Sequence, residues 1–314
     1  MRVWRYISDH DNGITNFHFE IEADRLTEEE LELLVTLRSG MVQMEIGVQS
    51  ANPNTLRSVH RRPDLTRIWD AVARLVPAQN INLHLDLIAG LPYEDMASFQ
   101  HSFNEVYGMQ PHQFQVGFLK LLKGTELYDR REEYGLVCSE DAPYEVLKTK
   151  WLSYEELDLL HRISDRVEEF VNTQGFRRSL PLAERLFPDA FALYEALAEY
   201  YRIHGYEQQR PSVTRRYEIF AEFLKEAECK LTAAELAEKH AECGTAVVDL
   251  AELLEWVRLD QFLHTHPSRR MSAEETFRLN GRRVRLHFDY QHTSPVNGEA
   301  AYCVVEPEGV ADFV

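Results

Sequence analysis

Residues 44–62, MEIGVQSANPNTLRSVHRR, contain the end of a predicted strand and the start of a predicted helix. Apolar and polar residues alternate up to Gln49, a pattern typical of a strand with one buried and one polar face. Asn52-Pro53 then turns the chain into a helical stretch that ends in basic residues. Solubility alone can explain one polar residue at the end of a strand. Polar residues at the ends of neighbouring strands, on the same face, would instead indicate a functional site.

Three further segments show the same two-residue alternation, and helical patterns lie between them. The predicted strands are residues 16–22 (NFHFEIE), 42–49, 81–88 (INLHLDLI) and 113–119 (QFQVGFL), and the predicted helices are residues 26–40, 64–76 and 95–109. A strand–helix repeat of about 30 residues is the length that a parallel βαβ crossover requires. The chain is therefore predicted to begin with an α/β fold.

One face of each predicted strand is apolar, whereas the other carries Glu, Gln, Asp, His or Gly. Strands of an open parallel sheet covered on both faces read as continuous apolar runs. We therefore predict a closed or partly closed (β/α) barrel with a polar, ligand-filled interior. Four strands are too few to close a barrel, so we expect further strands before Met1, and an exposed edge at residues 16–22 that favours dimerisation or poor solubility.

The pattern changes towards the C-terminus, where amphipathic helices follow one another from residue 154. Two segments near the end, residues 284–290 (VRLHFDY) and 300–306 (AAYCVVE), read as strands. We predict a partial barrel over residues 1–135 and a mainly α-helical domain with a short terminal strand pair over residues 136–314.

Composition excludes several classes of partner. The chain of 314 residues has a net charge of −18, which repels nucleic acid. No apolar run reaches the length of about 18 residues that spans a membrane. The four cysteines lack CxxC or zinc-type spacing, and the first residues lack a secretory signal, so a cytoplasmic protein with reduced thiols and no metal site is expected.

Three polar residues, Glu20, Gln49 and Asp86, fall near the C-terminal ends of consecutive predicted strands on one face. In βα barrels this rim carries the chemistry, because the βα loops converge there. A carboxylate and an amide suit paired ribose hydroxyls or an ammonium group, and Arg61 suits a carboxylate. These residues predict a small-molecule site, unless the polar side chains only solvate one another.

The combined pattern of EIGVQSANPNTLRSVHRR and HLDLIAGLPYEDMASF resembles the radical S-adenosylmethionine (SAM) superfamily over about residues 14–125. The resemblance is strongest to the branch with oxygen-independent coproporphyrinogen oxidase and the cobalamin-binding radical SAM proteins. The helical tail resembles an uncharacterised domain that follows the barrel in some cobalamin-associated members. The visible strands would be the family's third to sixth.

The resemblance implies roles for single residues. Glu20 would contact the methionine end of SAM, and Gln49 and Asp86 would meet the ribose hydroxyls. Arg61 would lie near the methionine carboxylate or the sulfonium, and residues 116–119 would line the adenine side.

The sequence departs from the family in one respect, because it contains no CxxxCxxC loop for the four-iron four-sulfur (4Fe-4S) cluster. We therefore expect the C-terminal portion of a longer radical SAM enzyme, or a truncated relative. In a complete protein the cluster would cleave SAM to a radical that abstracts hydrogen from an unknown small-molecule substrate. The resemblance also allows methyl transfer with cobalamin, and a reductase such as flavodoxin or ferredoxin as partner.

Two alternatives stay open. A degenerate barrel could bind SAM, a nucleotide or a protein partner without catalysis. A conventional hydrolase could use Glu20, Glu45 and Asp86 as paired carboxylates, but it leaves the Gly-Val-Gln-Ser strand end and the Asn-Pro turn unexplained.

Overall fold

The structure is a computed structural model that describes residues 2–230, 249–265, 272–293 and 299–305. The chain divides into two compact units, Met1–Asn172 and Thr173–Val314. This division lies C-terminal to the domain boundary predicted at residue 135, because helix and loop segments up to Asn172 pack on the sheet of the first unit. The domains themselves, residues 1–135 and 136–314, stay a prediction.

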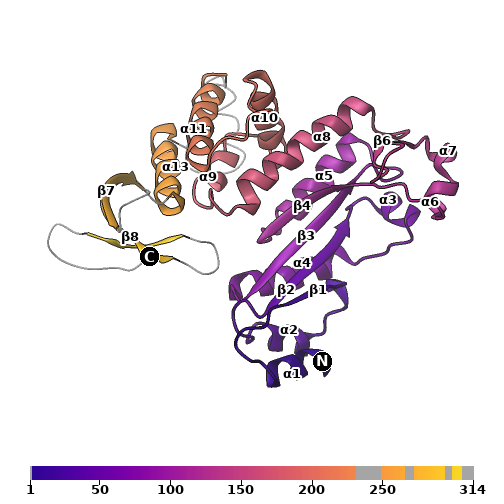
Figure 1. Cartoon of the computed structure of the whole chain (residues 1–314), viewed down its shortest axis with the longest axis horizontal. Coiled ribbons are helices and arrows are strands. Elements are labelled where there is room, and N and C mark those ends of the chain that lie inside the picture. Colours follow the sequence, from indigo (N-terminus) through magenta and orange to yellow (C-terminus); the bar gives the residue numbers. More distant parts are fainter. Residues whose placement is uncertain (1, 231–248, 266–271, 294–298, 306–314) are drawn as a thin grey trace. The chain divides into compact units, whose positions relative to one another are not determined.

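A four-stranded parallel sheet forms the centre of the first unit (Figure 1). Its strands lie side by side in chain order: β1 (Phe17–Glu20), β2 (Val42–Gln49), β3 (Ile81–Ala89) and β4 (Gln113–Phe118). All four were predicted from the alternation. Because the order never reverses, right-handed crossovers place the connecting helices on one face of the sheet.

The first unit also contains the helices and short strands that connect and follow these four strands. They are α1 (Arg2–Asp9), the 3-10 helix η1 (Ala23–Arg25), α2 (Glu28–Leu34), α3 (Pro53–Ser58), α4 (Leu65–Leu75), the 3-10 helix η2 (Val76–Ala78), α5 (Met96–Tyr107), α6 (Glu126–Asp129), α7 (Arg131–Tyr134), β5 (Val137–Cys138), β6 (Val146–Lys148), α8 (Tyr154–Val167) and the π-helix η3 (Glu168–Asn172). Side-chain caps begin several of them. Thr27 and Glu30 form the predicted capping box of α2, and Asp64 and Asp95 cap α4 and α5.

The predicted division of each strand into two faces is present. Alternate residues of β2 and β3 are buried, and the residues between them are only half-buried. Phe99, Phe103 and Val106 of α5 are fully buried, as the helical pattern predicted. The apolar face of the sheet therefore packs against its connecting helices, and the polar face carries the remaining side chains.

Segments after β4 complete the first unit. The Ser164 hydroxyl on α8 donates to the Val116 carbonyl over 3.0 Å. The Asn172 side chain accepts from the Phe114 N–H (2.9 Å) and donates to its carbonyl (3.0 Å), so it occupies the free edge of β4 as a strand residue would. These bonds explain why the compact unit extends to Asn172.

The sheet of the first unit is open. Within the described residues, β1 pairs only with β2, and no strand closes the sheet into a barrel. The α/β character and the parallel sheet are thus confirmed, whereas the partial barrel with strands three to six of the family stays a prediction.

The second unit is helical and ends in an antiparallel sheet. Its elements are α9 (Leu180–Glu184), α10 (Ala190–Ile203), α11 (Val213–Lys230), α13 (Leu250–His264), β7 (Ser272–Leu279), β8 (Arg282–Thr293) and β9 (Ala300–Val304). The predicted strand pair is therefore a sheet of three strands in the order β7-β8-β9. Asn280 and Gly281 join β7 to β8 with positive φ angles (51° and 71°), as a two-residue hairpin turn requires.

A buried carboxylate holds the second unit together. Asp260 on α13 is fully buried and accepts hydrogen bonds from the Ser179 N–H (2.9 Å), the Ser179 hydroxyl (2.8 Å) and the Arg178 N–H (3.2 Å). Arg178 in turn forms a two-bond ion pair with Glu299. A single side chain thus joins α13 to the segment before α9.

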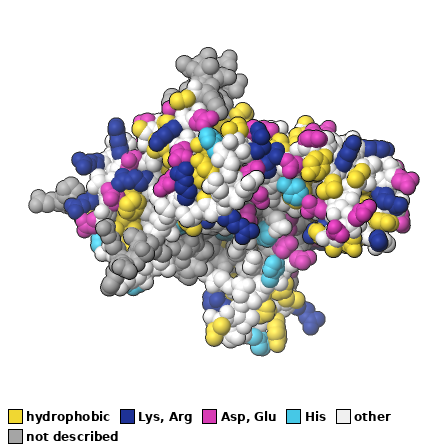
Figure 2. All heavy atoms as spheres, turned by 45° about the horizontal axis from the view of Figure 1, so that its top comes forward, with side chains coloured by type: hydrophobic (Ala, Val, Ile, Leu, Met, Phe, Trp, Pro, Cys, Tyr) yellow, Lys and Arg dark blue, Asp and Glu magenta, His cyan; other side chains and the backbone are white. Residues whose placement is uncertain are grey.

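Charged side chains of both signs are interspersed on the face of the protein shown in Figure 2. No helix in the described part of the chain is long and apolar enough to cross a membrane.

Replacing the buried carboxylate of the second unit is predicted to be costly. Asp260→Ala leaves three buried donors without an acceptor, so it should lower the free energy of unfolding of this unit by about 3 kcal/mol. Chemical denaturation measures the change. Glu218→Ala, which removes an exposed carboxylate of the same unit, is the control and should change stability by less than about 0.5 kcal/mol. Equal effects of the two substitutions would contradict the role of Asp260.

Candidate functional site

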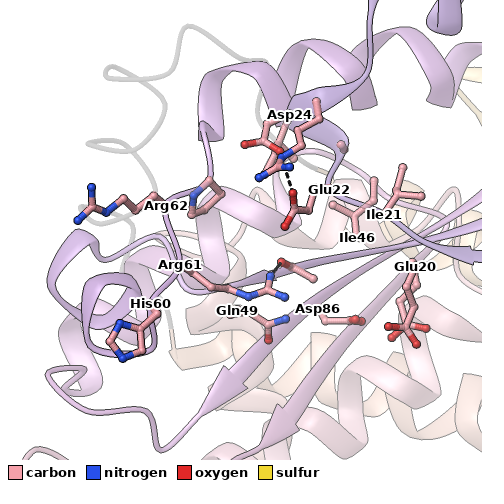
Figure 3. Close-up of a pocket in the computed structure, with 16 residues that line it drawn as sticks. Glu20, Ile21, Glu22, Asp24, Ile46, Gln49, His60, Arg61, Arg62 and Asp86 are labelled. Atoms are coloured by element: carbon pink, nitrogen blue, oxygen red, sulfur yellow. Dashed lines mark hydrogen bonds and ion pairs between the residues drawn. The ribbon is translucent and has the colours of Figure 1, made fainter. Parts of the chain in front are cut away.

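A polar cavity of about 480 Å³ opens at the C-terminal ends of β1, β2 and β3 (Figure 3). All four residues predicted from the sequence, Glu20, Gln49, Arg61 and Asp86, line it. Figure 3 shows Glu20, Asp86 and Gln49 spread across the strands, with Arg61 beside Gln49. The remaining lining residues are Ile21, Glu22, Ala23, Asp24, Arg25, Glu45, Ile46, Gly47, His60, Arg62, Pro63 and Ile68.

Gln49 reaches the cavity because the end of β2 departs from regular strand geometry. Its φ angle is 71°, and the register with β3 shifts between Gly47 and Gln49. The side chain folds back over Gly47, where an added Cβ would lie 2.3 Å from the Gln49 amide nitrogen. The Gln49 amide oxygen is buried and has no hydrogen-bond partner among the described residues. This oxygen is an acceptor that a ligand could satisfy.

Arg61 is anchored to the same strand end. Its guanidinium donates to the Gly47 carbonyl over 2.7 Å, and its backbone N–H donates to the Leu56 carbonyl of α3 over 2.9 Å. The other guanidinium N–H groups make no hydrogen bond within the described part of the chain. Arg61 is therefore a fixed cation with donors left for an anionic group.

Asp86 on β3 is held by a histidine of its own strand. His84 Nε2 lies 3.0 Å from Asp86 Oδ1, and both side chains are mostly buried. The hydrogen bond with Asp86 is the main cause of a raised pKa for His84, and the charge of Glu45 adds to it. The pair favours a cationic His84, and the contact with His84 orients the Asp86 carboxyl group in the wall of the cavity.

The outer strand adds further carboxylates. Glu20 lies at the end of β1 opposite Glu45 of β2, and Glu45 is bonded to His18 over 3.1 Å. Glu22 and Asp24 follow in the loop after β1. Asp24 accepts from the backbone N–H of Asp64 (3.0 Å), which ties this loop to the start of α4.

The cavity thus has two electrically distinct parts. The end of β1 and the loop after it supply mainly carboxylates, one of which, Glu22, is paired with Arg25 over 2.5 Å, whereas His60, Arg61 and Arg62 come from the segment after α3. A ligand that carries an ammonium group and a carboxylate at opposite ends matches this arrangement. The polar middle, formed by Gln49 and Asp86, suits hydroxyl groups.

A buried glutamate beside the cavity was not recognised from the sequence. Glu94 follows β3 and is fully buried, and its Oε1 lies 2.5 Å from the Ser50 hydroxyl and 3.0 Å from the Ser102 hydroxyl. Burial raises the pKa of Glu94 to about 7, although both serine hydrogen bonds oppose the shift. The only sequence signal was its position two residues after Gly90-Leu91-Pro92.

Residues 116–119 were predicted to line the adenine side of SAM. None of them lines the cavity, and Val116 and Leu119 are buried. Alternation places Val116 on the apolar face of β4, away from the polar face that carries the site. Conversely, Glu22, Asp24 and His60 line the cavity although no sequence pattern predicted a role for them.

The described residues offer no ligand set for a metal or cluster. No group of three or more His, Cys, Asp or Glu side chains in the described ranges could hold a metal ion. The free cysteines there, Cys138, Cys229 and Cys303, lie on β5, α11 and β9. These residues do not fit an iron–sulfur cluster.

Stability is predicted to depend on pH through Glu94. A carboxyl whose pKa is raised from about 4.5 to about 7 stabilises the fold while protonated, so the contribution is full at low pH and is lost as pH rises to about 7. The free energy of unfolding of the protein, relative to Glu94→Gln, should fall by about 3 kcal/mol between about pH 5 and pH 8. Urea unfolding of both proteins at the two pH values measures it, and parallel pH dependences would contradict the prediction.

Parts of this chain match known protein sequences. Residues 132–285 match the family described as a protein of unknown function (DUF4080). The oxygen-independent coproporphyrinogen-III oxidase-like protein HemZ of Bacillus subtilis (strain 168) is 28% identical over 120 residues, which are 38% of this chain and 23% of that protein. The matched part is therefore less than a quarter of the curated relative.

Among solved structures, coproporphyrinogen III oxidase (HemN) from Escherichia coli, described as a radical SAM enzyme, has a TM-score of 0.37 and 20% sequence identity. That match covers 51% of this chain and 34% of HemN. The match to HemZ agrees with the resemblance of this chain to the branch of oxygen-independent coproporphyrinogen oxidase-like proteins.

Proposed function

We propose that the first unit binds S-adenosylmethionine in the cavity at the ends of β1, β2 and β3. The observation that carries the proposal is the buried, unpartnered amide oxygen of Gln49 beside Asp86 and Arg61. An acceptor without a donor is costly inside a protein, so its presence at the wall of a polar cavity favours a ligand with hydroxyl or N–H donors. The cavity volume of about 480 Å³ lies within the usual range for small-molecule sites.

The chemistry of SAM matches the arrangement of charges. Its ribose offers two adjacent hydroxyls, which would donate to the Asp86 carboxylate and the Gln49 amide oxygen. Its methionine end is a zwitterion, whose ammonium group suits Glu20 and whose carboxylate suits Arg61. The positive sulfonium lies between them, where the surrounding carboxylates stabilise it. A neutral nucleoside would use only the middle of the site.

We further propose a radical SAM-type role for the protein to which this chain belongs. If other residues of the whole protein held a reduced iron–sulfur cluster, that cluster would supply the electron for radical-based hydrogen abstraction from a small molecule. The cluster ligands would have to come from residues outside those described. Within the chain, Asp86 and Gln49 orient the nucleoside, and Glu20 and Arg61 hold the methionine end. Use of cobalamin, methyl transfer and reduction by flavodoxin or ferredoxin rest on the family resemblance alone.

A second candidate function is SAM binding without catalysis. It is favoured by the lack of a cluster ligand set among the described side chains. Titration of the isolated chain with iron and sulfide under reducing conditions tests this second candidate. Formation of a stable cluster, seen by its absorbance, would exclude the binding-only alternative.

The site residues make a direct binding prediction. The chain should bind SAM without added iron, and Gln49→Ala or Asp86→Ala should each weaken binding about 10-fold or more, since each loses a hydrogen bond worth about 1.5 kcal/mol. Isothermal titration calorimetry measures this. Glu29→Ala, on the exposed side of α2, is the control and should bind as the unchanged protein does. Binding that survives both site substitutions would contradict the proposed location.

Glycine at position 47 is predicted to be required for the site. Gly47→Ala would place a methyl group where the Gln49 amide lies, so the amide must move and SAM binding should weaken about 10-fold. Glu29→Ala, on the exposed side of α2 and away from the cavity, is again the control. Equal affinities of the two variants would show that Gln49 does not contact the ligand.

A further inference from the structure

The loops that follow β2 and β3 meet in a buried polar cluster behind the cavity. Its members are Ser50, Glu94 and Ser102, all fully buried, and they come from the end of β2, the loop after β3 and helix α5. None of them lines the cavity. A buried polar group is costly unless it is hydrogen-bonded. A hydrogen-bonded cluster, in turn, fixes the relative positions of the segments that supply its members.

Glu94 is the centre of this cluster. Its Oε1 lies 2.5 Å from the Ser50 hydroxyl and 3.0 Å from the Ser102 hydroxyl. Ser102 also accepts from the Ala51 N–H over 2.9 Å, and Ser50 accepts from the Asn52 N–H over 2.9 Å. The three residues after Gln49 are therefore all held through Glu94 or its partners.

These bonds fix the two ligand-facing groups at the end of β2. Gln49, with its left-handed φ of 71°, directly precedes Ser50. Such a conformation is unfavourable for a non-glycine residue and persists only where the surroundings impose it. The anchored Ser50 supplies that constraint, and it thereby sets where the Gln49 amide points.

The same cluster acts on Arg61 through the next turn. Asn52 caps α3, and its amide donates to the Tyr93 carbonyl over 2.9 Å, directly beside Glu94 in the chain. The segment after α3 carries Arg61, whose N–H donates to the Leu56 carbonyl and whose guanidinium donates to the Gly47 carbonyl. The position of the cation therefore also depends on the contact between the two loops.

We propose that Glu94 is a positioning residue of the SAM site, which fixes Gln49 and Arg61 by joining the loop after β3 to the end of β2. The expected effect on SAM affinity rests on the proposed function, whereas the expected effect on the conformation of residues 47–52 does not. Glu94 touches no part of the cavity, so it acts only through Ser50 and the Asn52 turn.

The cluster also requires a particular form of Glu94. Its Oε2 is buried and has no hydrogen-bond partner among the described residues. An ionised carboxylate would leave charge unsolvated at this oxygen, whereas the neutral acid can donate to a serine hydroxyl. A glutamine reproduces the size, neutrality and donor of the acid, so Glu94→Gln is the conservative variant that should retain function, and Glu94→Ala should not.

The test compares Glu94→Ala, Glu94→Gln and Asp260→Ala with the unchanged protein under conditions in which each is folded. Asp260→Ala is the matched control, because it disrupts a buried carboxylate cluster in the other unit. Two properties are measured: SAM affinity by calorimetry, and the Gln49 side-chain amide resonance with hydrogen exchange of residues 47–52 in the ligand-free protein.

Glu94→Ala should weaken SAM binding about 10-fold to 100-fold, shift the Gln49 resonance and speed exchange at residues 47–52, as expected for a displaced contact group. Glu94→Gln should restore affinity to within about 3-fold, and Asp260→Ala should change neither property. If Glu94→Ala does not fold, Ser102→Ala, which removes one of the two serine bonds, takes its place with the same expectations.

Unchanged exchange and an unchanged Gln49 resonance in Glu94→Ala would overturn the proposal, as would an equal effect of Asp260→Ala. If the unchanged protein binds no SAM, the proposed function fails. The resonance and exchange data then still decide whether Glu94 positions Gln49.

Discussion

Alternation of side chains along β2 and β3 is the constraint on which the rest of the first unit depends. Val42, Met44, Ile46 and Val48 are buried together with the matching residues of β3, so this face is committed to packing against helices. Each strand residue between them must then lie on the opposite face. A shift of one residue in register would exchange the two faces, and it would bury Glu45 and Asp86 in the apolar core.

That division explains how a site arises at one end of the sheet. Parallel strands bring their C-terminal ends to the same edge, and the polar face collects Glu20, Glu45 and Asp86 there. The strand pattern alone does not determine the direction of the Gln49 side chain, because the register of β2 with β3 shifts between Gly47 and Gln49. The buried hydrogen bonds of Ser50 and Glu94 complete the geometry, so the site depends on both the sheet and one tertiary contact.

The charge distribution of the cavity follows from the connections between elements. Most carboxylates come from β1 and its following loop, where Arg25 is paired with Glu22, and the remaining cations come from the segment between α3 and α4. The bond from the Asp64 N–H to Asp24 ties these two segments together at their outer ends. A zwitterionic ligand would span them, and its binding would offset the repulsion among the carboxylates.

Local patterns predicted much of this arrangement. The strand β2 begins and ends where its alternation does, and the capping box of α2 follows from Thr27 and Glu30. The cavity residues Glu20, Gln49, Arg61 and Asp86 could be grouped because strand parity and order place them on one face and edge. These features depend on neighbours in the sequence, or on rules that hold for all parallel sheets.

Features set by distant contacts could not be predicted. Glu94 reads as a surface carboxylate beside Asp95, and only the approach of Ser50 and Ser102 reveals its burial. Strand β7 contains charged residues at several positions, and its partner β8 is what makes it a strand. The extent of the first unit to Asn172 depends on hydrogen bonds to Phe114, which no local pattern encodes.

A crystal structure of the chain with S-adenosylhomocysteine tests the central claim most directly. The ribose hydroxyls should lie within hydrogen-bond distance of Asp86 and the Gln49 amide oxygen, and the amino-acid carboxylate should lie beside Arg61. A ligand bound elsewhere, or no bound ligand at saturating concentration, would contradict it.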